Sequence, residues 1–100
     1  MAKLELISPA QLNLLNEWLD LKSALEGSSL NTLLAYKRDL IDFFSFLTLY
    51  NESKNGVSQL ESIDQASMRS WMAENRRSGK TSRSIARQLS SVKSFYKWFA

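Results

Sequence analysis

The feature that most constrains this chain is the scarcity of residues that interrupt helices. Its 100 residues include only three glycines and one proline, and apolar residues recur at intervals of three and four along four long segments. This spacing places them on one face of an α-helix, and no segment keeps the strict alternation of a half-buried strand. The sequence therefore predicts an all-α domain rather than a turn-rich β fold.

Capping and turn residues divide the chain into four expected helices, which cover about residues 9–26, 29–50, 64–78 and 81–99. Each is preceded by a short polar residue that suits an N-cap: Ser8, Ser28 or Ser29, Asp64 and Thr81. The segment NESKNGVSQ, residues 51–59, is polar and contains a glycine, so it is predicted to be a loop. A single compact domain of four packed helices follows from this division.

Each expected helix carries an apolar stripe that would face a shared core. In the first helix the stripe comprises Leu12, Leu15, Leu19 and Leu25. In the second it comprises Leu33, Tyr36, Leu40, Phe44 and Leu47. The third contributes Met68, Trp71 and Met72. The last contributes Ile85, Leu89, Val92, Tyr96 and Phe99.

The composition excludes several kinds of chemistry. The chain has no cysteine and no histidine, which removes disulfides, thiolate and imidazole metal sites, and histidine-based catalysis. No apolar run approaches the roughly 18 residues that a membrane span requires, and the N-terminus lacks the apolar core of a signal peptide. We expect a soluble, cytoplasmic protein without a metal or cofactor.

The charges are distributed unevenly along the chain. Residues 1–74 hold six basic and ten acidic residues, whereas residues 75–100 hold seven basic residues and no acid. On a helical wheel the last helix places a row of arginine and serine opposite its apolar stripe: Arg83, Arg87, Ser90 and Ser94. Such a single-signed face indicates a polyanionic partner, double-stranded DNA above all. The alternative is a solvated basic face with no ligand.

The candidate DNA contacts lie along the last expected helix and at the start of the second. Arg83 and Arg87 are predicted to be the principal contacts, because a guanidinium forms paired hydrogen bonds to phosphate or to guanine. Residues expected to assist them from the same region are Lys80, Thr81, Ser84, Ser90 and Lys93. At the start of the second helix the candidates are Ser29, Asn31 and Thr32. For these three the sequence leaves open whether they only cap the helix or also contact phosphate.

Two segments resemble a known family. SLNTLLAYKRDLIDFFSFL is similar to the opening of the core-binding domain of tyrosine recombinases, through Thr32, Tyr36, Asp39-Leu40 and Phe46-Leu47. SGKTSRSIARQLSSVKSFYKWF is similar to its closing segment, through Gly79, Thr81, Ser84-Ile85-Ala86-Arg87, Leu89-Ser90 and Lys93-Ser94-Phe95-Tyr96. The likeness covers about residues 14–99 and is strongest to Xer-type recombinases. Ser82 and Lys93 depart from it, since many relatives have proline and arginine there.

The resemblance implies a compact orthogonal four-helix bundle of the SAM-like type that clamps one face of a DNA duplex. It also implies a separate C-terminal catalytic domain beginning soon after Ala100, and sister recombinase protomers as partners at a recombination site in the bacterial nucleoid. Since the catalytic residues of that family lie in the other domain, and Tyr36 and Tyr96 fall on core stripes, no catalytic residue is expected in this chain. A helical protein–protein interaction module is the alternative function; an independent enzyme is disfavoured, because no paired catalytic constellation is evident.

Overall fold

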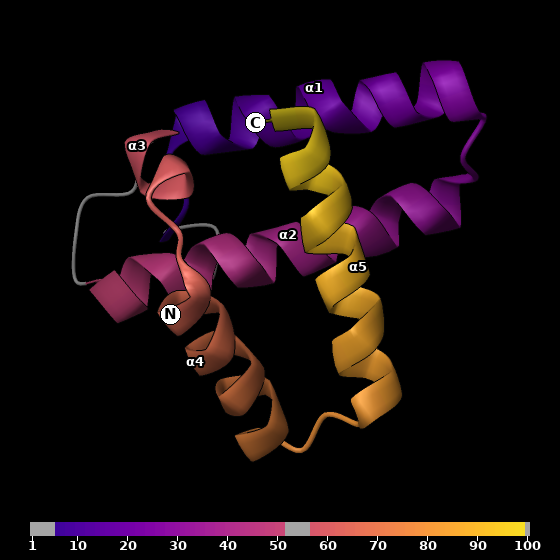
Figure 1. Cartoon of the computed structure of the whole chain (residues 1–100). Coiled ribbons are helices and arrows are strands. Elements are labelled where there is room, and N and C mark those ends of the chain that lie inside the picture. Colours follow the sequence, from indigo (N-terminus) through magenta and orange to yellow (C-terminus); the bar gives the residue numbers. More distant parts are fainter. Residues whose placement is uncertain (1–5, 52–56, 100) are drawn as a thin grey trace.

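A computed structural model describes residues 6–51 and 57–99 of the chain (Figure 1). Its helices are α1 Pro9–Glu26, α2 Leu30–Asn51, α3 Val57–Glu61, α4 Gln65–Arg77 and α5 Ser82–Phe99. The described residues contain no strand. The predicted all-α class is therefore confirmed, and four of the helices lie where the sequence predicted long ones.

The helices form two hairpins that cross. Helices α1 and α2 run antiparallel, and α4 and α5 form a second pair whose axes run steeply across the first (Figure 1). Helix α2 contacts each of the other four helices, and α4 also contacts α5. The most extensive of these helix–helix contacts is the one between α2 and α5.

Edge-to-face aromatic contacts join the hairpins in the core. The ring of Phe95 in α5 lies 5.5 Å from that of Trp18 in α1 and 5.4 Å from that of Phe44 in α2. Phe43 of α2 meets Trp71 of α4 at 5.0 Å. These side chains are almost completely buried, so one cluster of rings ties all four long helices together.

The short helix α3 corrects the sequence prediction, because it begins inside the segment that was expected to be a loop. Its Gln59 and Leu60 are buried, and Gln59 accepts hydrogen bonds from Gln11 of α1 at 3.0 Å and from Thr48 of α2 at 3.3 Å. The hydroxyl of Tyr96 donates to the carbonyl of Leu60 at 2.8 Å, and burial raises the pKa of that hydroxyl. Tertiary contacts, rather than local sequence, thus hold this turn in place.

Two stripe positions also differ from the prediction. Leu25, assigned to the core stripe of the first helix, is 75% exposed, because the last turns of α1 extend past the point where α5 crosses (Figure 1). Phe95, outside the predicted stripe, is fully buried. Since α5 packs against both α2 and α4, its buried arc is wider than the stripe that a single-sided contact would produce.

The predicted caps are present at the starts of the long helices. Ser8 and Gln11 form a capping box on α1, and Ser29 accepts a hydrogen bond from the backbone N–H of Thr32 at the start of α2. Asp64 accepts one from the N–H of Ser67 at 2.8 Å in α4. The hydrogen bonds from the Ser67 backbone and side chain hold the pKa of the Asp64 carboxyl below its ordinary value of 3.8.

Phe44→Ala should lower the free energy of unfolding by about 3–5 kcal/mol, because it leaves a cavity at the junction of the two hairpins. Urea unfolding followed by circular dichroism measures this. Leu34→Ala on the same helix is the matched control, since Leu34 is 55% exposed and its truncation should change stability by no more than about 0.5 kcal/mol. Equal effects of the two substitutions would contradict the core described above.

Asp64→Asn should remove one pH-dependent contribution to stability. Because the folded pKa of Asp64 lies below its ordinary value, the charged cap stabilises the fold fully above the ordinary pKa and loses that effect as the pH falls through the folded pKa. The wild type should therefore melt above Asp64→Asn at neutral pH, and the two melting temperatures should converge in acid. A gap that stays constant as the pH falls would show that the charge of Asp64 contributes nothing.

Candidate nucleic-acid interface

The turn between α4 and α5 sets the direction of the basic helix. Gly79 has φ of 91°, a conformation that side-chain-bearing residues avoid. Its N–H donates to the carbonyl of Arg76 at 3.0 Å, and the N–H of Lys80 donates to that of Asn75 at 3.1 Å. Thr81 then caps α5, since its Oγ1 accepts from the N–H of Ser84 at 3.1 Å. Lys80 and Thr81 are thereby fixed at the N-terminal end of α5.

The outer face of α5 carries most of the predicted contacts. Arg83, Arg87, Ser90 and Lys93 are exposed, and Ser84 is half-buried. Within the described part of the chain, Arg83 and Lys93 form no ion pair. Their charges are therefore free to meet an anion without first breaking a contact inside the protein.

Arg87 is held by a buried carboxylate that the sequence analysis had not assigned. Its Nη1 donates to Oδ2 of Asp39 at 3.0 Å, and the hydroxyl of Ser91 donates to the same oxygen at 2.8 Å. Asp39 lies in α2 and its side chain is 1% exposed, whereas that of Arg87 is 46% exposed. The guanidinium thus spans the boundary between the core and the solvent.

Lys80 and Arg87 share a pocket between α2 and the beginning of α5. This pocket of about 320 Å³ is lined by Arg38, Asp42, Lys80, Ser84, Arg87 and Gln88. Lys80 lies 3.5 Å from Asp42 of α2. Three basic side chains therefore surround one concavity that Asp42 of α2 also lines.

These ion pairs modify the picture of an uncompensated basic segment. The sequence has no acid after residue 74, but Asp39 and Asp42 reach Arg87 and Lys80 from α2, and Glu74 pairs with Arg77 at 2.9 Å. Spacing along one helix does not reveal partners from a neighbouring helix. The uncompensated cationic surface of this segment is consequently narrower than the sequence suggested.

The candidates at the start of α2 form a separate group. Ser29 caps the helix, and its hydroxyl lies 2.9 Å from that of Thr32, while Asn31 is exposed. None of the three lines the pocket between α2 and α5. The first turn of α2 extends beyond its crossing with α5 (Figure 1). These three residues would therefore extend the candidate DNA-binding surface along α2, away from the pocket.

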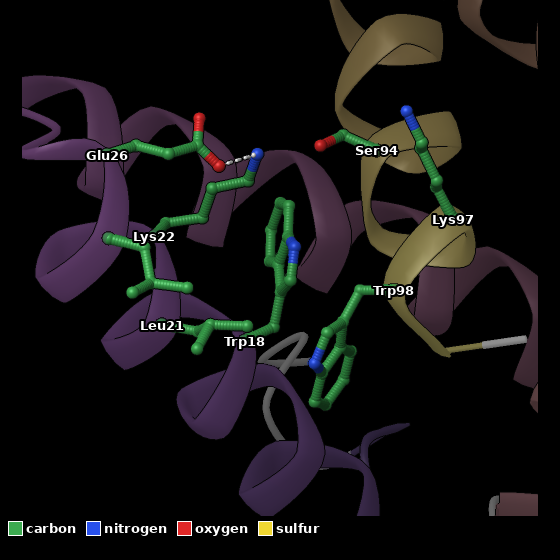
Figure 2. Close-up of a pocket in the computed structure, with 8 residues that line it drawn as sticks. Trp18, Leu21, Lys22, Glu26, Ser94, Lys97 and Trp98 are labelled. Carbon is green, nitrogen blue, oxygen red and sulfur yellow. Dashed lines mark hydrogen bonds and ion pairs between the residues drawn. The ribbon is translucent and has the colours of Figure 1, made fainter.

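The C-terminal end of the predicted arginine–serine row belongs to a different surface. Ser94 and Lys97 line a second pocket of about 240 Å³ between α1 and α5, together with Trp18, Leu21, Lys22, Leu25, Glu26 and Trp98 (Figure 2). Lys22 pairs with Glu26 at 2.8 Å and lies 5.7 Å from the centre of the Trp18 ring. Mixed charge and exposed apolar surface distinguish this pocket from the basic face.

The described part of the chain offers neither a metal-binding cluster nor a membrane-spanning helix. Residues 6–51 and 57–99 contain no group of three or more side chains suited to hold a metal ion. No helix among them is both long enough and apolar enough to cross a bilayer.

Sequence reasoning gave no functional part to Arg38, Asp39, Asp42 or Gln88. A signal existed for Asp39, which follows Tyr36 by three residues and precedes Phe43 by four. It therefore lies on the flank of the buried face of α2. An acid that is buried at such a position needs a partner. Arg87 on the neighbouring helix α5 is that partner.

Comparison with known proteins identifies the family. The model of the phage integrase N-terminal SAM-like domain matches residues 15–100. Curated relatives include the tyrosine recombinases XerC of Rickettsia typhi and Rickettsia prowazekii, each 35% identical over 85 residues, and that of Rickettsia canadensis, 33% identical over 85 residues. These alignments cover 85% of this chain.

The alignments cover only 28% of each relative, so the chain matches less than a third of their length. No solved structure matches the chain significantly. The family match spans most of the described helices, including both segments that carry the candidate contacts. The chain therefore belongs to the family of phage integrase N-terminal SAM-like domains, the domain found at the start of Xer-type tyrosine recombinases.

Proposed function

We propose that this domain binds double-stranded DNA as the core-binding part of a site-specific tyrosine recombinase. The observation that carries the proposal is the outer face of α5, where Arg83 and Lys93 are exposed and unpaired within the described chain. Beside them lies the pocket of Arg38, Lys80 and Arg87. In a member of a recombinase family, such a basic face is suited to bind the phosphates of the DNA backbone that border a groove.

The candidate contacts divide by the chemistry they offer. Either Arg83 or Arg87 is suited to read a base edge, since a guanidinium can form two hydrogen bonds to guanine. Phosphate contacts would come from Lys80, Thr81, Ser84, Ser90 and Lys93, and from Ser29, Asn31 and Thr32 at the start of α2. Phosphate contacts fix the position of a protein on the duplex and base contacts select the sequence.

The role of the whole recombinase follows as part of the same proposal. The four long helices would act as an orthogonal bundle that clamps one face of the recombination site, while a catalytic domain elsewhere in the protein carries out strand exchange. Its partners would be that domain and sister protomers on the same DNA, in the bacterial cytoplasm at the nucleoid. The process served would be DNA integration or the resolution of chromosome dimers.

A protein–protein contact is the second candidate function, and exposed leucines favour it. Leu25 is 75% exposed and Leu30 is 70% exposed, on either side of the turn between α1 and α2. Exposed apolar side chains of this kind are typical of interaction surfaces. Leu30 stands between Ser29 and Asn31 in the chain, so a protein partner there would compete with DNA for the start of α2.

The first test is the salt dependence of DNA binding. With about five phosphate contacts, log affinity for a short mixed-sequence duplex should fall with log salt at a slope near −4 to −5, because binding releases counterions from the DNA. Fluorescence anisotropy with labelled duplex in increasing KCl measures the slope. A slope near zero, or no binding to any duplex at low salt, would reject DNA binding in favour of the protein–protein function.

The second test separates binding from stability. Arg83→Ala should weaken DNA binding by about 1–3 kcal/mol and leave the unfolding transition unchanged, because its side chain is exposed and has no ion pair in the described chain. Arg87→Ala should weaken binding and also lower the free energy of unfolding by about 1–3 kcal/mol, since Asp39 remains buried without its cation.

Arg69→Ala is the matched control for both substitutions. Arg69 is exposed on α4 and does not line the pocket between α2 and α5, so its loss should change neither quantity appreciably. If Arg69→Ala weakened binding as much as Arg83→Ala, the effect would reflect net charge alone and the assignment to α5 would be wrong.

A further inference from the structure

The pocket between α2 and α5 has features that a flat basic surface lacks. Its lining includes one cation from each of three places: Arg38 in α2, Lys80 in the turn before α5, and Arg87 in α5. Arg38 is exposed and forms no ion pair in the described part of the chain. Side chains from separate elements that converge on one concavity suit a compact anion better than an extended one.

Two of these cations are already held in position by acids. Asp42 lies 3.5 Å from Lys80, and the Oδ2 atom of Asp39 receives both Arg87 and Ser91. Arg87 donates one N–H group to Asp39, and its side chain is 46% exposed. Its other N–H groups therefore remain available on the solvent side. A guanidinium fixed in this way needs little reorganisation to receive a ligand.

The start of α5 adds donors and positive potential beside the three cations. The hydroxyl of Ser84 accepts a hydrogen bond from Thr81 Oγ1 at 3.2 Å, so its own proton remains available to donate to an oxyanion. The first backbone N–H groups of α5, an 18-residue helix, lie next to the pocket through Ser84, and the positive end of the helix dipole favours an anion there. The buried Oε1 of Gln88, which has no hydrogen-bond partner among the described residues, is an acceptor and adds nothing to anion binding.

We propose that this pocket binds a single phosphate group of the DNA backbone through Arg38, Lys80 and Arg87, and that Asp39 is a positioning residue that orients Arg87 toward it. The inference rests on the proposed DNA-binding function and adds to it a defined phosphate site, with a residue of α2, Arg38, that sequence reasoning had passed over. Asp39 and Asp42 offset part of the charge of the three cations, so the pocket keeps only a small net positive charge. Anions that do not fit the pocket are therefore attracted only weakly.

Arg38→Ala tests the pocket itself. The affinity for a short mixed-sequence duplex should fall about tenfold, and the salt slope should become shallower by about one, because one phosphate contact is lost. Arg38→Lys should restore the slope but only part of the affinity, since lysine keeps the charge and loses the planar donor group. Arg69→Ala should bind as the wild type does. Wild-type affinity and slope in Arg38→Ala would overturn the proposal.

Asp39→Asn tests the positioning role, and the sign of the effect is decisive. Removing a negative charge close to bound DNA should strengthen binding if only electrostatics acts. If Asp39 orients Arg87, the folded variant should instead bind about tenfold more weakly, and the substitution should have no such effect in an Arg87→Ala background. Equal or tighter binding by Asp39→Asn would overturn the positioning role.

A second variant keeps this test usable if Asp39→Asn does not fold. Ser91→Ala removes one of the two hydrogen bonds to Asp39 Oδ2 and keeps the charge, so it should weaken DNA binding in the same direction by a smaller factor. A folded Ser91→Ala with unchanged affinity would count against the positioning role. Thermal unfolding of each variant establishes that it is folded at the temperature of the binding measurement.

Inorganic phosphate distinguishes a DNA phosphate from a free anion. At constant ionic strength, the amide resonances of Ser84 and Arg87 should shift with duplex at far lower concentration than with inorganic phosphate. Saturation by inorganic phosphate at the lower concentration would assign the pocket to a small anion and overturn the inference. If Arg83→Ala weakens duplex binding while Arg38→Ala and Asp39→Asn do not, the phosphate site fails and the proposed function stands; if the wild type binds no duplex, the proposed function itself fails.

Discussion

Every other helix in the described chain packs against α2, and this constraint decides where each charged side chain can lie. Contacts along its length position α1, α3, α4 and α5, and the ring of Phe44 within it meets Phe95 of α5. A helix surrounded in this way buries more than one stripe of its surface. Polar residues near the edge of the usual stripe, Asp39 among them, are thereby enclosed and must find partners from the helices that enclose them.

The pairing of Asp39 with Arg87 links the core to the proposed DNA face. The carboxylate is buried and the guanidinium is half exposed, so the same contact that satisfies the core also orients a surface cation. A residue on the outer side of α5 would therefore contribute to folding as well as to the proposed DNA binding. Arg83, one turn earlier and without an ion pair in the described chain, has only the second role. Two arginines that look equivalent in the sequence therefore differ in what their loss would do.

Local patterns were sufficient to predict the long helices and their caps, because a cap such as Thr81 depends on residues only three positions apart. They were also sufficient to relate the chain to its family, since each motif is one continuous segment that covers a helix and the residues just before it. They failed where distant segments meet. Helix α3 depends on Gln59 reaching Gln11 and Thr48, and Asp39 depends on a residue far along the chain in α5. The outer face of α5 was predictable in outline, but the pocket beside it was not, because two of its six lining residues, Arg38 and Asp42, come from α2.

The ion pair with Asp39 also determines at which step the Arg87 side chain loses its rotamer freedom. A free arginine on a surface samples many rotamers, and fixing it at the moment of association costs up to about 2 kcal/mol. Here most of that restriction occurs when the helices pack. The buried side of the ion pair is screened by salt much less than a contact in open solvent. If the domain binds DNA as proposed, a rise in ionic strength would release the duplex while the Arg87 guanidinium stays oriented by Asp39, and the geometry for the next binding event would already be set.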